Sequence, residues 1–178
     1  EKELPKIDKN AIVIDALFGS GINKAIEGLY ADTINAINKS HATVVAVDIP
    51  SGLYIDKQNE SNIIIHADYT ISFQVPKLAF MFPQHYSIVG EWYSLYIGLS
   101  RAYIENAETS YYYLDESIIK NSVKKRLKFS HKGDYGKCLL IVGSYGMLGA
   151  AVLSTKACLR TGSGLVYTYV PEDGFFVL

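Results

Sequence analysis

Residues able to bind a ligand or move a proton gather in two short segments of the first half of the sequence. One runs from Asp15 into the glycine-rich stretch Gly19–Lys24, and the other runs from Asp48 through Ser51 to Gly52. Glycines let backbone N–H groups approach a phosphate closely, and a helix N-terminus adds positive potential. Asp48 could act as an acid or base or hold a ribose hydroxyl, whereas Asp15 and Ser51 offer hard oxygens that suit a cation.

The elements around these segments predict an α/β sheet. Residues 11–17 and 43–47 are short apolar, β-branched runs, which predict buried strands, and residues 29–39 carry helical apolar spacing. The order strand, loop, helix, strand implies a parallel crossover. Because ligands of parallel sheets bind outside the carboxyl ends of the strands, we expect both segments to face one crevice.

A second α/β pattern begins after a polar region at residues 98–130, which we interpret as a connection. Tyr111–Tyr113 within it predicts an edge strand or a docking segment, and a second glycine-rich turn lies at Gly143–Gly149. Further strands are predicted at residues 69–73, 92–97, 137–142 and 165–170, and further helices at residues 114–127 and 150–161. One crossover cannot bury a core of its own, so we expect the last unit to pack against residues outside this sequence.

Composition excludes several classes of protein. The 178 residues carry 17 Lys+Arg and 18 Asp+Glu, a balance that argues against nucleic-acid binding. No apolar stretch reaches the roughly 18 residues needed to span a bilayer, so no membrane partner is expected. Cys138 and Cys158 are too few for a disulfide framework or a zinc site, and their apolar surroundings predict buried thiols in a reducing compartment, the cytoplasm.

Common nucleotide motifs do not fit. Gly19-x-Gly21 lacks the last glycine of a dinucleotide fingerprint, because Lys24 stands there, and the Gly136-Lys137 pair lacks the rest of a P-loop. Glycine-rich turns also serve as plain chain reversals, and a strand-end aspartate is often a cap. Spacing alone therefore leaves a ligand site and a structural role equally open.

Longer motifs carry a resemblance to a known family. Asp15–Gly21 (DALFGSG), Glu27–Tyr30 (EGLY) and Val47–Leu53 (VDIPSGL) closely resemble the NAD(P)H-hydrate epimerase domain of YjeF N-terminal type. Ala67-Asp68, Thr70, Phe73 and Pro76-Lys77 fit the next strand and loop of that family. The resemblance implies a three-layer Rossmann-like parallel sheet, with residues 1–100 as the later part of the epimerase domain and residues 101–130 as a connection.

Residues 131–178 resemble the opening of the ADP/ATP-dependent NAD(P)H-hydrate dehydratase, a ribokinase-like α/β domain. The motifs are His131–Lys137 (HKGDYGK) and Gly143–Ala151 (GSYGMLGAA). The order epimerase, dehydratase matches the bifunctional repair enzymes. The resemblance implies that the earlier phosphate loop of the epimerase, and the adenine-nucleotide site and catalytic aspartate of the dehydratase, lie outside this sequence.

The resemblance implies repair of a damaged nicotinamide nucleotide. NAD(P)H hydrate carries water across a ring double bond; the epimerase interconverts its R and S forms, and the dehydratase removes water from the S form while consuming ADP or ATP with magnesium. Potassium is the second expected cofactor. NAD(P)H hydrate is the expected small-molecule partner, and a homo-oligomer is the expected assembly.

The same resemblance assigns roles by position. Asp15 and Ser51 would help bind potassium, and Asp48 would contact the substrate as the candidate acid or base. Ala150 would touch the hydrate in the dehydratase unit, where Lys132 and Tyr135 would shape the entrance. The loop that would wrap the dinucleotide consists of Gly19, Ser20, Gly21, Ile22, Asn23, Lys24 and Ala25.

Two alternatives stay open at this point. One is a nucleotide-binding module without turnover, which shares every feature named above. The other is a small-molecule kinase of ribokinase type, which fits only the last part of the sequence, whereas the Asp48-x-Pro-Ser51-Gly52 segment favours the epimerase.

Overall fold

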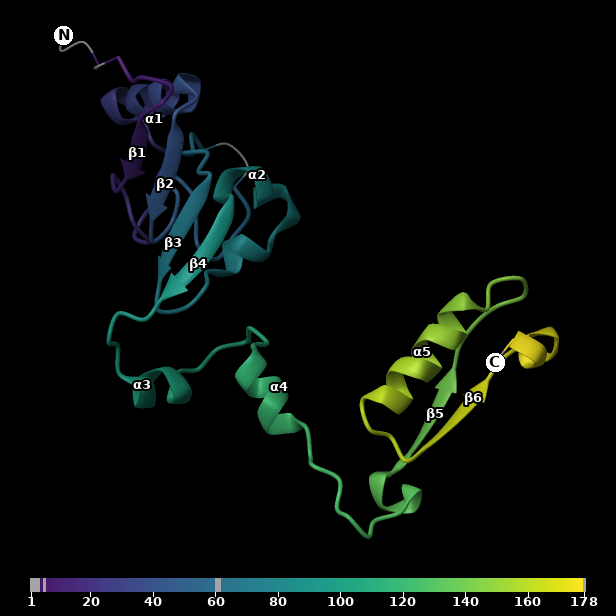
Figure 1. Cartoon of the computed structure of the whole chain (residues 1–178). Coiled ribbons are helices and arrows are strands. Elements are labelled where there is room, and N and C mark those ends of the chain that lie inside the picture. The colour runs from purple at the N-terminus through teal and green to yellow at the C-terminus, as the bar shows by residue number, and fades with distance from the viewer. Residues whose placement is uncertain (1–3, 5, 60–61, 178) are drawn as a thin grey trace. The chain divides into compact units, whose positions relative to one another are not determined.

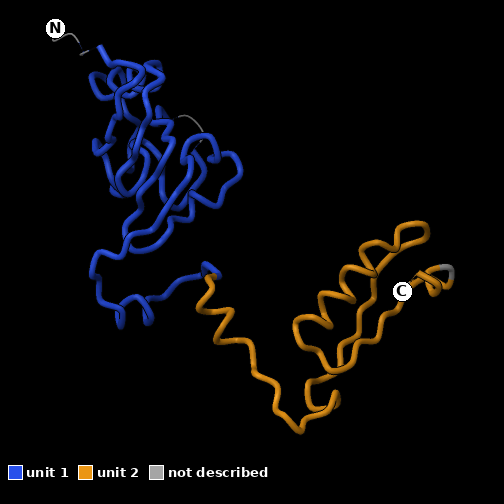
Figure 2. The backbone as a smooth tube through the Cα atoms, in the orientation of Figure 1, with its two compact units in different colours: residues 1–114 blue, residues 115–178 orange. Residues whose placement is uncertain are grey.

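The chain forms two compact units, residues 1–114 and residues 115–178 (Figure 2). The structure is a computed structural model, and it describes residues 4, 6–59 and 62–177. Figure 1 labels the main helices and strands of both units.

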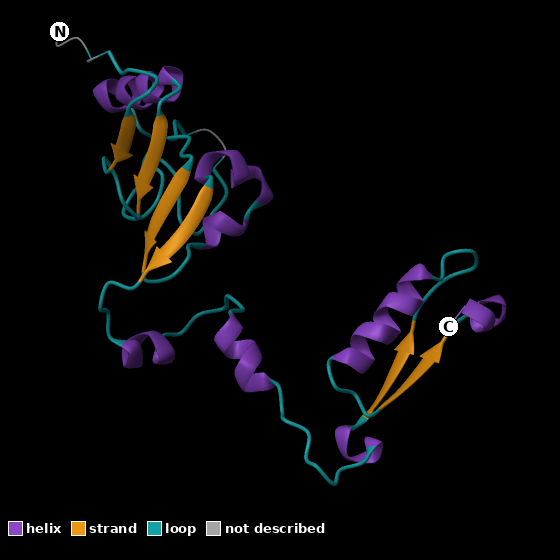
Figure 3. Ribbon diagram, in the orientation of Figure 1, coloured by secondary structure: helices purple, strands orange, loops and turns teal. Residues whose placement is uncertain are grey.

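The first unit is built around a four-stranded sheet. Its elements are β1 (Ile12–Asp15), α1 (Gly28–Ser40), β2 (Thr43–Val47), β3 (Tyr69–Phe73), the 3₁₀ turns Leu78–Met81 and Pro83–His85, α2 (Tyr86–Val89), β4 (Glu91–Leu95) and α3 (Arg101–Asn106). The strands are all parallel and lie in the order β1-β2-β3-β4, so their carboxyl ends share one edge, as the arrows in Figure 3 show.

Local sequence accounts for the central elements. The β-branched run of β2 suits a strand and fills its predicted bounds. Helix α1 buries a stripe of Ala31, Ile34 and Ile37 against the sheet, as its spacing predicted, and ends where His41 adopts a left-handed conformation with φ of 56°.

Helices cover one face of this sheet. Residues paired in register share a face, and Val44, Ala46, Thr70 and Ser72 are all buried beneath α1 and the segment from Leu78 to Val89. The α/β parallel sheet is therefore as predicted. Of the three expected layers, the described residues supply two, the sheet and one helical layer.

The opposite sheet face is open among the described residues, and this corrects the prediction for residues 11–17. They were expected to form a buried strand, but β1 is short, and Ile12 and Ile14 are 70% and 68% exposed. The reason is that β1 is an edge strand with one neighbour and one covered face. Tyr69, Phe73, Tyr93 and Leu95 share its open face.

The polar region after β4 contains less structure than expected. Helix α4 (Glu116–Ser122) is shorter than the predicted 114–127, because the residues that follow stay exposed and Arg126 contacts Tyr135 and the Gly162 carbonyl instead of its own helix. Tyr111–Tyr113 is not a strand. Tyr113 instead packs edge-on against Trp92 at 5.8 Å between ring centres, in line with the docking alternative.

The second unit has one parallel strand pair covered by one helix. Its remaining elements are the 3₁₀ turn Lys132–Tyr135, β5 (Lys137–Ile141), α5 (Gly149–Arg160), β6 (Leu165–Tyr169) and the 3₁₀ turn Glu172–Val177. Leu139, Ile141, Tyr167 and Tyr169 on its uncovered face are all more than half exposed, while Ala151 is fully buried. A single crossover thus leaves one apolar face open within this unit, as expected.

The two cysteines correct a further prediction. Cys138 and Cys158 are free thiols, but both are half-buried rather than buried. The reason is that the strand β5 and the helix α5, which carry them, are each covered on one side only. A hydrogen bond between the two thiols is the main cause that raises the pKa of Cys138 above its ordinary value. Within the described residues, no helix has the length and apolarity needed to cross a bilayer.

Candidate functional site

The strand order brings three loops to one edge of the first sheet. Asp15 is the last residue of β1, Asp48 directly follows β2, and Phe73 ends β3. Because these three strands are adjacent and parallel, the loops that follow them emerge side by side, as predicted for a ligand site of this sheet class.

Asp15 and Ser51 are joined by hydrogen bonds in a buried cluster, the Asp15 knot. The Ser51 amide donates to Asp15 Oδ2 at 2.7 Å, and the Ser51 hydroxyl donates to Asp15 Oδ1 at 2.6 Å. The Ser51 oxygen accepts the Phe18 amide at 2.9 Å and lies 3.2 Å from the Phe18 carbonyl oxygen. Asp15 and Ser51 are each only 1% exposed, so this knot ties the loop after β1 to the loop after β2.

The oxygen atoms of this knot are ligands of the kind that suits a hard cation. A carboxylate, a hydroxyl and the Phe18 carbonyl bring oxygens together, and no Lys, Arg or His of the described residues lies within ion-pair distance of the buried Asp15. Oxygen ligands are what hard cations select. Within the described part of the chain, no group of three or more His, Cys, Asp or Glu side chains forms a metal cluster.

The predicted ligand loop lines a hollow of about 490 Å³. Six residues of the loop line it, Gly19, Gly21, Ile22, Asn23, Lys24 and Ala25, whereas Ser20 is exposed outside it. Phe18 and Tyr30 also line this hollow and pack edge-on at 4.9 Å between ring centres. Among the described residues, no backbone amide from Gly19 to Ala25 donates a hydrogen bond, so these donors are free for an anion.

Asp48 occupies a strained turn. Its φ is 67°, and the Ile49 amide donates back to the Val47 carbonyl at 2.9 Å, the pattern of a γ-turn. Its amide donates to the Ile71 carbonyl at 2.8 Å and so stays joined to β3. Strained non-glycine residues cluster at functional sites, which supports a role beyond capping.

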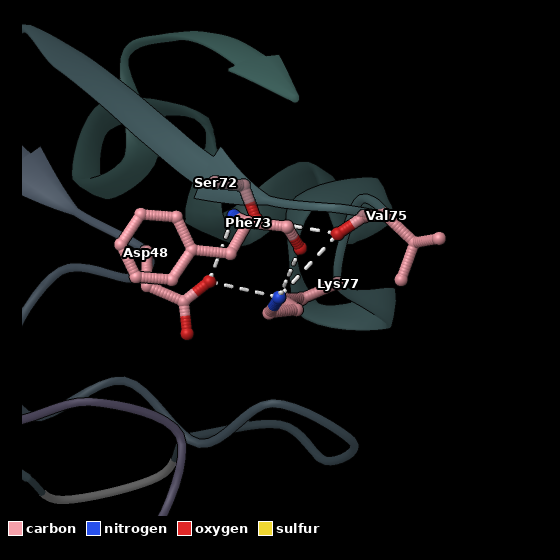
Figure 4. A network of polar contacts seen from close by, with 5 residues as sticks. All are labelled: Asp48, Ser72, Phe73, Val75 and Lys77. Atoms are coloured by element: carbon pink, nitrogen blue, oxygen red, sulfur yellow. Dashed lines mark hydrogen bonds and ion pairs between the residues drawn. The ribbon is translucent and has the colours of Figure 1, made fainter. Parts of the chain in front are cut away.

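The Asp48 carboxylate is anchored by one oxygen. Oδ1 accepts the Phe73 amide at 3.0 Å and lies 2.9 Å from Lys77 Nζ, as Figure 4 shows. Oδ2 has no hydrogen-bond partner among the described residues. One fixed oxygen and one available oxygen is an arrangement that can accept or return a proton.

A larger hollow of about 590 Å³ lies elsewhere on this unit, at the edge strand β4. Half of its lining residues are aromatic, among them Phe80, Trp92 and Tyr113, and none of the predicted site residues lines it. The smaller hollow has the free amides and adjoins the Asp15 knot through Phe18, and we therefore take it as the candidate site.

In the second unit, Ala150 is accessible. It lies in the first turn of α5 and is exposed, while Ala151 beside it is fully buried. Packing of α5 against the strands therefore does not account for an alanine at position 150. Lys132 is exposed, whereas the Tyr135 hydroxyl accepts the Leu127 amide at 2.9 Å and so holds the preceding segment.

Two residues that help to build the site, Lys77 and Asn62, were given no role from the sequence. Lys77 was only part of a motif, although a lysine shortly after a strand end could have been tested as a carboxylate partner. Asn62 accepts the Ile26 amide at 3.1 Å and donates to the Gly52 carbonyl at 2.6 Å, which joins the end of the ligand loop to the Ser51 segment. No local sequence pattern predicts hydrogen bonds of this kind between segments that lie far apart in the chain.

Comparison with known proteins shows what this chain is similar to. Residues 1–79 match the family described as YjeF-related protein N-terminus. The chain is similar to the bifunctional NAD(P)H-hydrate repair enzymes of Thermofilum pendens (37% identity over 153 residues, 86% of this chain and 28% of the relative), Moorella thermoacetica (36% over 161 residues, 90% and 30%) and Escherichia coli (32% over 155 residues, 87% and 30%). The chain thus spans 28–30% of the length of these three relatives. Residues 1–79 thus carry a domain of the YjeF-related N-terminal family, and the chain over most of its length is similar to bifunctional NAD(P)H-hydrate repair enzymes.

Proposed function

We propose that the protein carrying this chain repairs NAD(P)H hydrate, with the first unit in epimerisation and the second in dehydration. The observation that carries the proposal is the anchored Asp48 carboxylate, on the same sheet edge as a loop of free amides. The names of the relatives support the same reaction class and do not favour a small-molecule kinase or a module without turnover.

The loop Gly19–Ala25 would hold the diphosphate of the dinucleotide. Its amides are free, and a phosphate is the anion that such donors and the helix start at Gly28 attract. The exposed Lys24 adds a positive charge to the same wall.

Asp48 would move the proton in epimerisation. Inverting the hydrated carbon beside a ring nitrogen requires its hydroxyl to leave as water, with the nitrogen lone pair forming a C=N bond. Water then returns on the other face, and the proton is released again, so the step is balanced without a co-reactant. A carboxylate with one oxygen fixed and the other available can give and take this proton.

Potassium fits the knot around Asp15. Asp15 and Ser51 would hold the ion together with the Phe18 carbonyl, and the ion would supply a positive charge beside a buried carboxylate. Ser51 and Phe18 already fix the loop after β1, so this chain's own contacts orient the ligand loop.

The second unit would take part in dehydration with ADP or ATP and magnesium. Ala150 is exposed at the start of α5, next to the turn Gly143–Gly149, and is therefore able to contact a ligand. We extend the proposal to a homo-oligomer, which is the expectation from the family resemblance, and to the cytoplasm, which is the expectation from the free thiols Cys138 and Cys158.

The test uses the full protein and a mixture of R and S NADH hydrate with magnesium, potassium and ATP or ADP. Return of reduced-nicotinamide absorbance reports dehydration. Complete recovery from both epimers, faster than their spontaneous interconversion, is the expected result. Recovery of the S form alone would remove epimerisation from the proposal, and no recovery would overturn both activities.

A further inference from the structure

Lys77 is the central member of a network at the ends of β2 and β3 (Figure 4). Its ammonium nitrogen lies 2.9 Å from Asp48 Oδ1, 3.1 Å from the Phe73 carbonyl oxygen and 3.4 Å from the Val75 carbonyl oxygen. An ammonium has three hydrogens to donate, and these three acceptors use them all. Lys77 is therefore held by the protein and acts on a ligand only through its neighbours.

The ion pair of Lys77 with Asp48 is largely withdrawn from water. The two side chains are 15% and 14% exposed, unlike the pairs Arg101–Glu105 and Lys120–Glu116, whose side chains are all more than half exposed. Removing one partner of a buried pair leaves a charge without compensation, whereas exposed pairs contribute little. The charge of Lys77 thus matters to Asp48 in a way that no surface lysine would.

Two strained turns flank the ion pair. Gln74 repeats the pattern of Asp48, with φ of 64° and a hydrogen bond from the Val75 amide to the Phe73 carbonyl at 2.7 Å. Such turns persist only where the surroundings hold them. Lys77 bonds to the carbonyls on both sides of Gln74 and to the carboxylate of Asp48, so one side chain fastens both turns.

We propose that Lys77 is a positioning residue for the epimerisation. It holds Oδ1 of Asp48, together with the Phe73 amide, so that Oδ2 is the oxygen presented to the hydrated ring. Its charge also compensates the carboxylate when no ligand is bound. This inference rests on the proposed function of the Asp48 site.

Two substitutions separate charge from shape. Lys77→Met keeps the length of the stem and removes the ammonium, while Lys77→Arg keeps the charge. In the full protein we expect Lys77→Met to lower the kcat of epimerisation roughly tenfold or more, with KM changed less than about threefold, and Lys77→Arg to restore part of the rate. Lys39→Met, at an exposed lysine in the last turn of α1, is the matched control and should behave as wild type.

A double variant tests whether Lys77 acts through Asp48. In the Asp48→Asn background, Lys77→Met should cause no further loss of kcat, because residues that act as one unit are not additive. If the lysine had a purely structural role, Lys77→Met would instead lower thermal stability. It would also reduce the rate by the same factor in the wild-type and Asp48→Asn backgrounds.

Each outcome decides the inference. Wild-type kcat in Lys77→Met, or additive losses in the double variant, would overturn it. If Lys77→Met fails to fold, Lys77→Gln, which can still donate to a loop carbonyl, replaces it; a folded Lys77→Gln with low kcat supports the inference, and failure of both to fold makes the lysine structural and overturns it. Absence of epimerisation in the wild type would instead refute the proposed function.

Discussion

The two strand-end aspartates of the first unit are held in different ways. Both oxygens of Asp15 accept hydrogen bonds, and its side chain is buried, so it organises the loops around it. Asp48 is fixed through one oxygen and is partly exposed. At the scale of single residues, the first carboxylate therefore builds the site, and the second is available to do chemistry in it.

Ser51→Ala should destabilise the protein by about 1–3 kcal/mol, because it removes a partner from the buried Asp15 and from the Phe18 amide. Urea denaturation of both proteins measures this difference. Ser87→Ala, at an exposed serine of α2, is the control and should stay within about 0.5 kcal/mol of wild type. Equal stability of Ser51→Ala and wild type would contradict the structural role of the knot.

Sequence reasoning found part of this site. Asp15, Asp48 and Ser51 were predictable because they stand at strand ends, and parallel strands bring such ends together. Lys77 was not, because its partner lies 29 positions earlier and its side chain must turn back over its own loop to reach it. The direct bond between Asp15 and Ser51, which are 36 positions apart, also required the register of β1 with β2.

Helix α4 is held by its cap rather than by packing. Asp115 accepts the Ile118 amide at 2.9 Å and the Ser117 hydroxyl at 2.7 Å, and no residue of α4 is buried. These hydrogen bonds, that of Ser117 first, lower the pKa of Asp115 below its ordinary value. The cap therefore stabilises α4 above the unfolded-state pKa of this group, and that contribution is lost as the pH falls through the folded-state pKa.

NMR titration of the Asp115 carboxyl group tests this cap. We expect its midpoint to lie below the ordinary range for an aspartate and to move upward in Ser117→Ala, which removes the largest cause. The protection factor of the Ile118 amide, which corrects for the pH dependence of intrinsic exchange, should fall as Asp115 becomes protonated. A midpoint that Ser117→Ala leaves unchanged would contradict the cap.

Prediction of elements succeeded where packing agrees with local preference. The bounds of β2 and β3 matched, since both strands are central and their alternating residues are buried. Strand β1 and helix α4 were predicted too long, because apolar and charged patterns do not reveal how much neighbouring structure is present to cover them. For β1 and α4, the sequence pattern therefore predicted that the element exists but not where it ends.

An exposed segment lies near the start of the second unit. Between α4 and the turn at Lys132, residues 123–129 form no helix or strand and are exposed. Each unit has its own parallel sheet, and each leaves one apolar sheet face open among the described residues. The epimerase-like and dehydratase-like motifs fall in different units.

Limited digestion with trypsin should cut first in this segment, after Lys124, Lys125, Arg126 or Lys128, because exposed irregular backbone is the preferred site of proteolytic nicking. Mass spectrometry of the early products would identify the cut. First cleavage after Lys39 in α1 or Lys156 in α5 would contradict the exposed, irregular backbone of residues 123–129.

The central claim is that Asp48 carries out epimerisation in this protein. The most direct measurement is the rate of R-to-S interconversion of NADH hydrate by the full protein as wild type, Asp48→Asn and Asp56→Asn, the last being an exposed aspartate outside the site. We expect Asp48→Asn to lose about 100-fold or more of the rate with its melting transition retained, and Asp56→Asn to match wild type. Undiminished interconversion by Asp48→Asn would contradict the account.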